Sequence, residues 1–144
     1  MNKAKVLLIS PNLKGIKDGL NRIQPSLGLM LIAQSLLNAK HIVKIHDTAL
    51  EGWDNRKEIN NNMITIGQSD DGIKKVISDF SPDVVAISVL FSNLMESAHN
   101  IAFLVKEVNS SIKVVLGGNH ISNVIIDYQI GLSDKKSNLP NEIK

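Results

Sequence analysis

The sequence predicts an α/β domain with a doubly wound, open parallel sheet and helices on both faces. Apolar runs of strand length alternate along the chain with segments of helical period, and this alternation is typical of parallel strands joined by covering helices. The chain has 144 residues, 43% of them apolar, which is enough for one sizeable core. We therefore expect one domain over residues 1–131 and a polar tail or linker over residues 132–144.

Four segments have the composition of strands. They are Lys5–Ser10, Ile42–Asp47, Asp83–Leu90 and Ile112–Leu116. The first and third are nearly continuous apolar runs, as buried central strands are, whereas the second alternates apolar and polar residues, as an edge strand does. Right-handed crossovers then favour the flavodoxin-like order 2-1-3-4, with a ligand crevice between the first and third strands.

Three segments have the helical period. One opens at Pro25-Ser26, one starts at Asp70-Asp71 and ends before Pro82, and one carries its apolar residues between Leu94 and Val108. Residues 48–69 show no clear period, so a functional loop and a short helix both stay open. Residues 121–131 fit either a helix or a piece of a fifth strand, and residues 132–144 have no apolar period.

Composition excludes several classes of function. The 16 basic and 14 acidic residues are scattered, which disfavours a nucleic-acid partner. The absence of cysteine excludes disulfides, a thiolate zinc site and a cysteine-ligated iron–sulfur cluster from this chain. No segment has the order of a signal peptide or the ~20 apolar residues of a membrane span. We expect a cytoplasmic protein.

The carboxyl ends of parallel strands meet at one edge of a sheet, so the loops over residues 10–15, 88–92 and 117–120 should lie together. Ser88 places a hydroxyl at the end of an apolar strand, and Gly117-Gly118 removes two β-carbons where a ligand could approach the backbone. Each feature also has an ordinary structural explanation, as a strand end or a turn. A dinucleotide fingerprint, a phosphate loop and a catalytic triad are absent.

At these loops the sequence resembles the cobalamin-binding domain family. Its better-known members carry D-x-H-x-x-G after the first strand, S-x-L after the third and G-G after the fourth. Ser88-Val89-Leu90 and Gly117-Gly118 match the last two patterns. In the first pattern Gly15 is kept, but Ser10 stands at the position of the aspartate and Asn12 at that of the cobalt-ligating histidine.

That departure resembles the N-terminal cobalamin domains of radical S-adenosylmethionine enzymes, a group that includes methylases and the anaerobic magnesium-protoporphyrin ester cyclase. The lower-ligand histidine is commonly missing there. Further likeness lies in residues 24–29, 47–52 and 117–120, so that the resemblance covers roughly residues 5 to 125.

The resemblance implies a module that binds cobalamin base-off, holds the cofactor and is not a complete enzyme. The displaced dimethylbenzimidazole tail would lie between the first and third strands, with Asn12 facing cobalt. No residue of this chain would be catalytic or ligate the metal. The implied cofactor-binding residues are Ser10, Pro11, Asn12, Gly15, Pro25, Ser26, Leu27, Asp47, Ser88, Leu90, Phe91, Ser92, Gly117, Gly118, Asn119 and His120.

The resemblance also implies a catalytic radical S-adenosylmethionine domain, in the full-length protein or as a separate partner. That domain would carry the iron–sulfur cluster and S-adenosylmethionine, for methyl transfer or related chemistry. The competing hypothesis is a cofactor-free flavodoxin-like regulatory or interaction domain. The acidic cluster that a phosphorylated receiver needs is absent after the first strand, where Ser10-Pro11-Asn12 stands, which disfavours this alternative.

Overall fold

A four-stranded parallel sheet forms the centre of the molecule. The computed structural model describes residues 3–129, so the proposed boundary at residue 131 and the tail over residues 132–144 lie outside the described residues. The strands are β1 (Lys5–Ser10), β3 (Ile42–Asp47), β6 (Val84–Ser88) and β7 (Lys113–Gly117). Their order is β3-β1-β6-β7, with every neighbouring pair parallel. The predicted strand order and fold class are confirmed.

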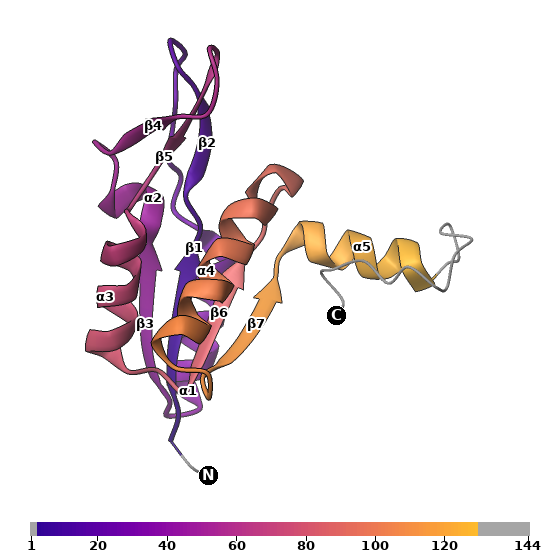
Figure 1. Ribbon diagram of the computed structural model, residues 1–144. Coiled ribbons are helices and arrows are strands. Elements are labelled where there is room, and N and C mark those ends of the chain that lie inside the picture. Colours follow the sequence, from indigo (N-terminus) through magenta and orange to yellow (C-terminus); the bar gives the residue numbers. More distant parts are fainter. Residues whose placement is uncertain (1–2, 130–144) are drawn as a thin grey trace.

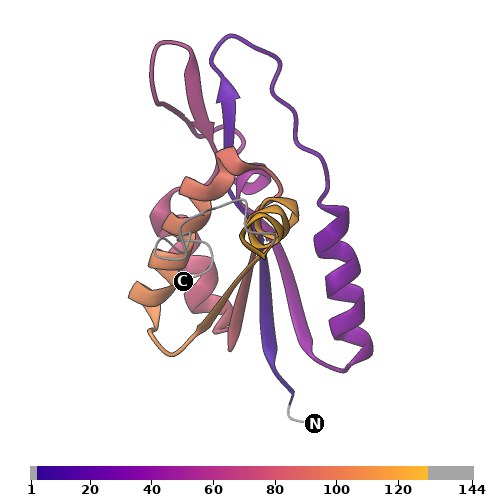
Figure 2. The ribbon, with the colours of Figure 1, turned by 90° about the vertical axis from the view of Figure 1, so that its right-hand side faces the viewer.

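Helices cover both faces of this sheet (Figure 2). One face is covered by α1 (Leu27–Asn38), and the other by α3 (Asp70–Phe80) and α4 (Met95–Val108). The hydroxyl of Ser26 caps the start of α1 by accepting the N–H of Leu29. No helix within residues 3–129 is long and apolar enough to cross a membrane.

The last described helix, α5 (Asn119–Gln129), leaves the sheet beyond the end of β7 and projects away from it (Figure 1). Of the two structures that stay open for residues 121–131, the helix is therefore the right one as far as residue 129. The start of α5 is anchored in the main core, where Ile121 is buried. As a result, α5 does not cover the sheet, and Val115 of β7 remains 51% exposed.

The alternation of side chains along β1 divides the core into two layers. Leu7 and Ile9 pack with the residues beneath α3 and α4, whereas Val6 and Leu8 pack beneath α1. Successive side chains of a strand point to opposite faces. A strand covered on both faces must therefore be apolar where it is buried, which explains the unbroken apolar run over residues 6–9.

A second, smaller sheet rises above the carboxyl edge of the first (Figure 1). It consists of β2 (Leu13–Ile16), β5 (Met63–Ile66) and β4 (Arg56–Glu58), all antiparallel in the order β2-β5-β4. The short-helix interpretation of residues 48–69 is right only for α2 (Thr48–Glu51). The rest of that segment is a hairpin that pairs with residues from the first loop.

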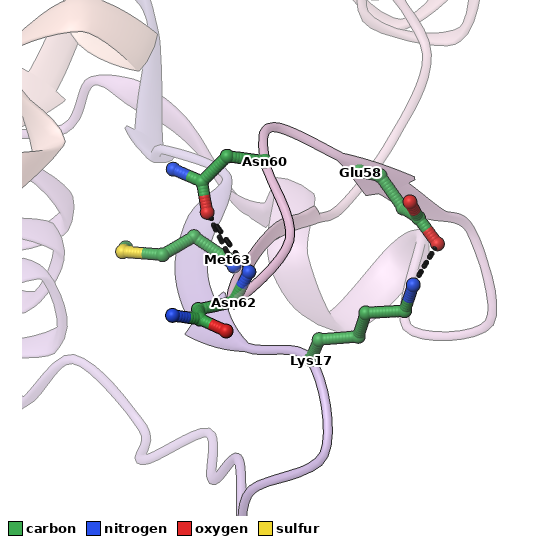
Figure 3. Close-up of polar contacts among 5 residues, drawn as sticks. All are labelled: Lys17, Glu58, Asn60, Asn62 and Met63. Atoms are coloured by element: carbon green, nitrogen blue, oxygen red, sulfur yellow. Dashed lines mark hydrogen bonds and ion pairs between the residues drawn. The ribbon is translucent and has the colours of Figure 1, made fainter.

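Local polar contacts hold this hairpin (Figure 3). The side-chain oxygen of Asn60 accepts the backbone N–H groups of Asn62 and Met63 at 3.0 and 2.9 Å, a turn that asparagine forms readily. Lys17, just beyond β2, pairs with Glu58 of β4 at 2.5 Å. The hydrogen bond and charge of the Glu58 carboxylate raise the pKa of the Lys17 ammonium.

Candidate functional site

A largely apolar cavity of about 850 Å³ opens at the carboxyl edge of the main sheet. Its wall comes from the ends of β1, β6 and β7 and from the chain that leads into α1. This is the topological switch point at which open α/β sheets bind ligands, and the volume lies within the usual ~300–1,000 Å³ of ligand pockets.

Most of the residues singled out from the sequence line this cavity. They are Ser10, Pro11, Pro25, Ser26, Leu27, Asp47, Ser88, Leu90, Phe91, Gly117, Gly118 and Asn119. The predicted crevice between the first and third strands therefore corresponds to a real concavity, because β1 and β6 are neighbours in the sheet.

Two predicted residues, Asn12 and Gly15, support the loop after β1 and do not line the cavity. The side-chain amide of Asn12 donates to the carbonyl of Gln68 at 3.0 Å, and its buried Oδ1 has no hydrogen-bond partner within residues 3–129. A β-carbon at Gly15 would lie 2.2 Å from the side-chain oxygen of Asn21. Both positions are thus explained by packing of the polypeptide.

The other two predicted residues outside the cavity wall are Ser92 and His120. Ser92 begins the short 3₁₀ helix η1 (Ser92–Leu94) that leads into α4. The backbone N–H of His120 donates to the carbonyl of Val89 at 3.2 Å and so joins the start of α5 to the end of β6.

The two glycines at the end of β7, Gly117 and Gly118, differ in what they contribute. A β-carbon built on Gly117 meets no atom within 4 Å, whereas one on Gly118 would lie 2.6 Å from the carbonyl oxygen of Val89. Gly118 also has a φ of +111°, a backbone conformation that residues other than glycine rarely adopt. Gly118 is therefore required by the turn, while Gly117 leaves open space at the cavity wall.

Sequence reasoning missed the apolar floor of the cavity. Ala86 and Val115 lie opposite each other in the β6–β7 pair, and Leu29 and Ile32 face them from α1. The alternation along both strands contained this signal, because Ala86 and Val115 are apolar and lie on the same face of the sheet. The sequence did not show that α5 would leave Val115 of β7 uncovered.

Sequence reasoning also missed Arg22, and it left Gly28 out of the cofactor-binding residues although Gly28 lies in the stretch of family likeness over residues 24–29. Arg22 lines the cavity from the loop before α1, and Gly28 lines it from the first turn of the helix. Nothing lies within 4 Å of a β-carbon built on Gly28, although glycine destabilises a helix relative to alanine. Packing within the chain therefore does not explain the choice of glycine there.

Within the described part of the chain, the cavity wall carries two charged side chains, Arg22 and Asp47. The Asp47 carboxylate caps α2 by accepting the N–H of Leu50 at 3.0 Å. Within residues 3–129 there is no group of three or more His, Cys, Asp and Glu side chains placed to hold a metal ion. The arrangement suits the binding of a large, mostly apolar ligand with a few polar groups.

Comparison with known proteins agrees with this description. The model of a protein family described as B12 binding domain matches residues 14–132. The chain is 36% identical over 118 residues to a cytidylyl-2-hydroxyethylphosphonate methyltransferase of Streptomyces wedmorensis, a match that covers 81% of this chain and 22% of the relative. It is 32% identical over 123 residues to an uncharacterized methyltransferase of Pyrococcus horikoshii, with 85% and 23% covered. The chain thus spans less than a quarter of the length of these relatives, and no solved structure matches it.

Proposed function

Because this chain belongs to the B12-binding domain family, we propose that it binds cobalamin in the base-off form, with no histidine of its own on cobalt. The observation that carries the proposal is the apolar cavity at the carboxyl ends of β1 and β6. In base-off cobalamin the dimethylbenzimidazole is displaced from cobalt, so the nucleotide tail needs a separate apolar site. The cavity is that site in our proposal.

The residues of the cavity fit such a tail. The apolar side chains of Ala86, Val115 and Ile32 in its lining suit a flat apolar base, and Gly117 leaves room at the wall. Ser88, on the same wall, offers a hydroxyl to the polar atoms of the tail. In our proposal these residues orient the cofactor over the edge of the sheet.

Two of the four histidines, His41 and His46, already have partners within the protein, which supports a cobalt site that neither of them ligates. His41 accepts the N–H of Ala4 near the amino end of β3, and His99 is exposed in α4. His46 is buried, with its Nε2 2.7 Å from the side-chain oxygen of Gln68. None of these residues, nor His120, lines the cavity.

Asn12 occupies the position of the missing ligand in the sequence pattern, but a neutral amide is a poor ligand for cobalt compared with imidazole. Its side chain is also held against Gln68.

We further propose that this module serves a cobalamin-dependent radical S-adenosylmethionine enzyme. When bound, cobalamin supplies a cobalt centre that can carry a methyl group, and the protein supplies position and electrostatics. The two relatives named above are methyltransferases by name, and each extends far beyond the segment that this chain matches. A catalytic domain with an iron–sulfur cluster and S-adenosylmethionine, in the full-length protein or in a separate chain, would complete the enzyme.

The proposal is tested by incubating the 144-residue chain with hydroxocobalamin and desalting it. We expect the protein to retain a red spectrum, and the electron paramagnetic resonance spectrum of the bound Co(II) form to lack axial nitrogen splitting. Failure to retain the cofactor would favour the cofactor-free regulatory domain. A nitrogen triplet that disappears when one histidine is replaced would refute the histidine-free cobalt site.

A further inference from the structure

Among the described residues that line the cavity, Arg22 is the one positively charged side chain. Its guanidinium forms no hydrogen bond or ion pair with any residue in the described part of the chain. Asp47, the anion of the cavity wall, uses its carboxylate to cap α2. A cation that no protein group neutralises, at the wall of a ligand cavity, indicates a ligand with negative charge.

The loop that carries Arg22 is held in place by its neighbour Asn21. The side-chain oxygen of Asn21 accepts the N–H of Ile16 at 3.0 Å, and its amide donates to the carbonyls of Ile16 and Gly19 at 2.9 and 3.2 Å. Asn21 fits there because Gly15 has no β-carbon. The backbone beside Arg22 is therefore fixed to the end of β2, which limits where the guanidinium can reach.

The nucleotide tail of cobalamin has a matching group. The tail joins its ribose and dimethylbenzimidazole to the corrin through a phosphodiester, whereas the amide side chains of the corrin are neutral. Guanidinium binds phosphate oxygens through paired, charge-assisted hydrogen bonds. A base held in the cavity brings the phosphodiester of the same tail to the cavity as well, and Arg22 lies on the cavity wall.

We propose that Arg22 binds the phosphodiester of the nucleotide tail and thereby makes the domain select complete corrinoids over cobinamide, which lacks the phosphate, ribose and base. This inference rests on the proposed binding of cobalamin. It adds Arg22 to the residues that bind the cofactor, and it means that the chain recognises the charge of the tail as well as the apolar character of its base.

The test compares Arg22→Gln with Arg56→Gln, which removes the same charge elsewhere. Arg56 lies on β4 with its guanidinium 5.4 Å from the Trp53 ring and does not line the cavity. Binding of cobalamin and of cobinamide is measured by absorbance titration at low and high salt, with a thermal melt of each variant.

We expect Arg22→Gln to weaken cobalamin binding about tenfold, the lower end for hydrogen bonds to a charged group, and to leave cobinamide binding unchanged. The loss should shrink at high salt. Arg22→Lys should recover part of the affinity, and Arg56→Gln should bind both corrinoids like the wild type.

Each contrary result has a distinct meaning. If the wild type binds neither corrinoid, the proposed function itself fails. If the wild type binds cobalamin but Arg22→Gln loses nothing, or loses affinity for both corrinoids equally, the role of Arg22 is refuted while cobalamin binding stands. If Arg22→Gln loses the same cobalamin affinity at low and at high salt, the charge contact between Arg22 and the phosphodiester is refuted.

Discussion

Replacing Gly117 with valine should weaken cobalamin binding without lowering the stability of the fold. Gly117 ends β7, and a β-carbon built there meets nothing within 4 Å. The backbone of a strand accepts a branched side chain, which raises β propensity relative to glycine. The fold should therefore tolerate Gly117→Val, with a melting temperature equal to or slightly above that of the wild type.

In the proposed complex, the same side chain takes space that the cobalamin tail needs. Forcing extra methyl groups into an occupied site costs about 1–3 kcal/mol, which corresponds to a roughly 5- to 150-fold loss of affinity. Absorbance titration with hydroxocobalamin measures the affinity, and circular dichroism measures the melting temperature.

Gly118→Ala is the matched control, because its β-carbon would collide with the Val89 carbonyl and its φ is +111°. Left-handed backbone alone costs an L-residue about 1–2 kcal/mol, and for a chain of this size each kcal/mol lowers the melting temperature by roughly 3 °C. The control should therefore melt at least a few degrees lower. If Gly117→Val melts as low as Gly118→Ala, or binds cobalamin like the wild type, Gly117 is only part of a turn and the reasoning is wrong.

Three further predictions follow from the same structure. Gly28→Ala should raise stability by up to about 1 kcal/mol and weaken cobalamin binding, since open space lies at that β-carbon; unchanged affinity would remove Gly28 from the site. Asn21→Ala should weaken binding of cobalamin more than that of cobinamide by loosening the loop of Arg22, and equal losses would argue against a positioning role. The hydrogen bond from Lys14 and then its charge lower the pKa of the Glu96 carboxyl, so this pair stabilises the fold above the unfolded pKa and is lost as the pH falls through the folded one. Urea titrations of wild type and Glu96→Gln should therefore converge toward pH 3, with a difference below about 1 kcal/mol at neutral pH because the pair is exposed; a constant difference would contradict this.

Much of the candidate site could be predicted because sheet topology converts sequence order into spatial proximity. Ser10, Ser88 and Gly117 are far apart in the chain, yet each ends a parallel strand, and the ends of neighbouring parallel strands meet at one edge. Arg22 was not predictable in the same way, because it lies in an irregular loop. Its place depends on the contacts of Asn21 with the second sheet.

The second sheet shows why short antiparallel strands escape sequence analysis. β2, β4 and β5 have only three or four residues each, too few for an alternation to stand out. β4 and β5 form a local hairpin, but β2 pairs with β5 across a long separation in sequence, with Leu13 opposite Ile66, so no local pattern indicates that β2 joins them. The turn residues around Asn60 were the one local signal.

The sequence by itself determined the fold class, the order of the four parallel strands and the edge at which their loops meet, because burial on both faces of β1 and β6 requires continuous apolar runs that periodicity exposes. Only the tertiary structure decided which loop residues face the cavity. Asn12 turns toward Gln68, Gly118 serves the backbone, and α5 leaves Val115 uncovered. These outcomes depend on contacts between segments distant in the chain, and such contacts leave no period in the sequence.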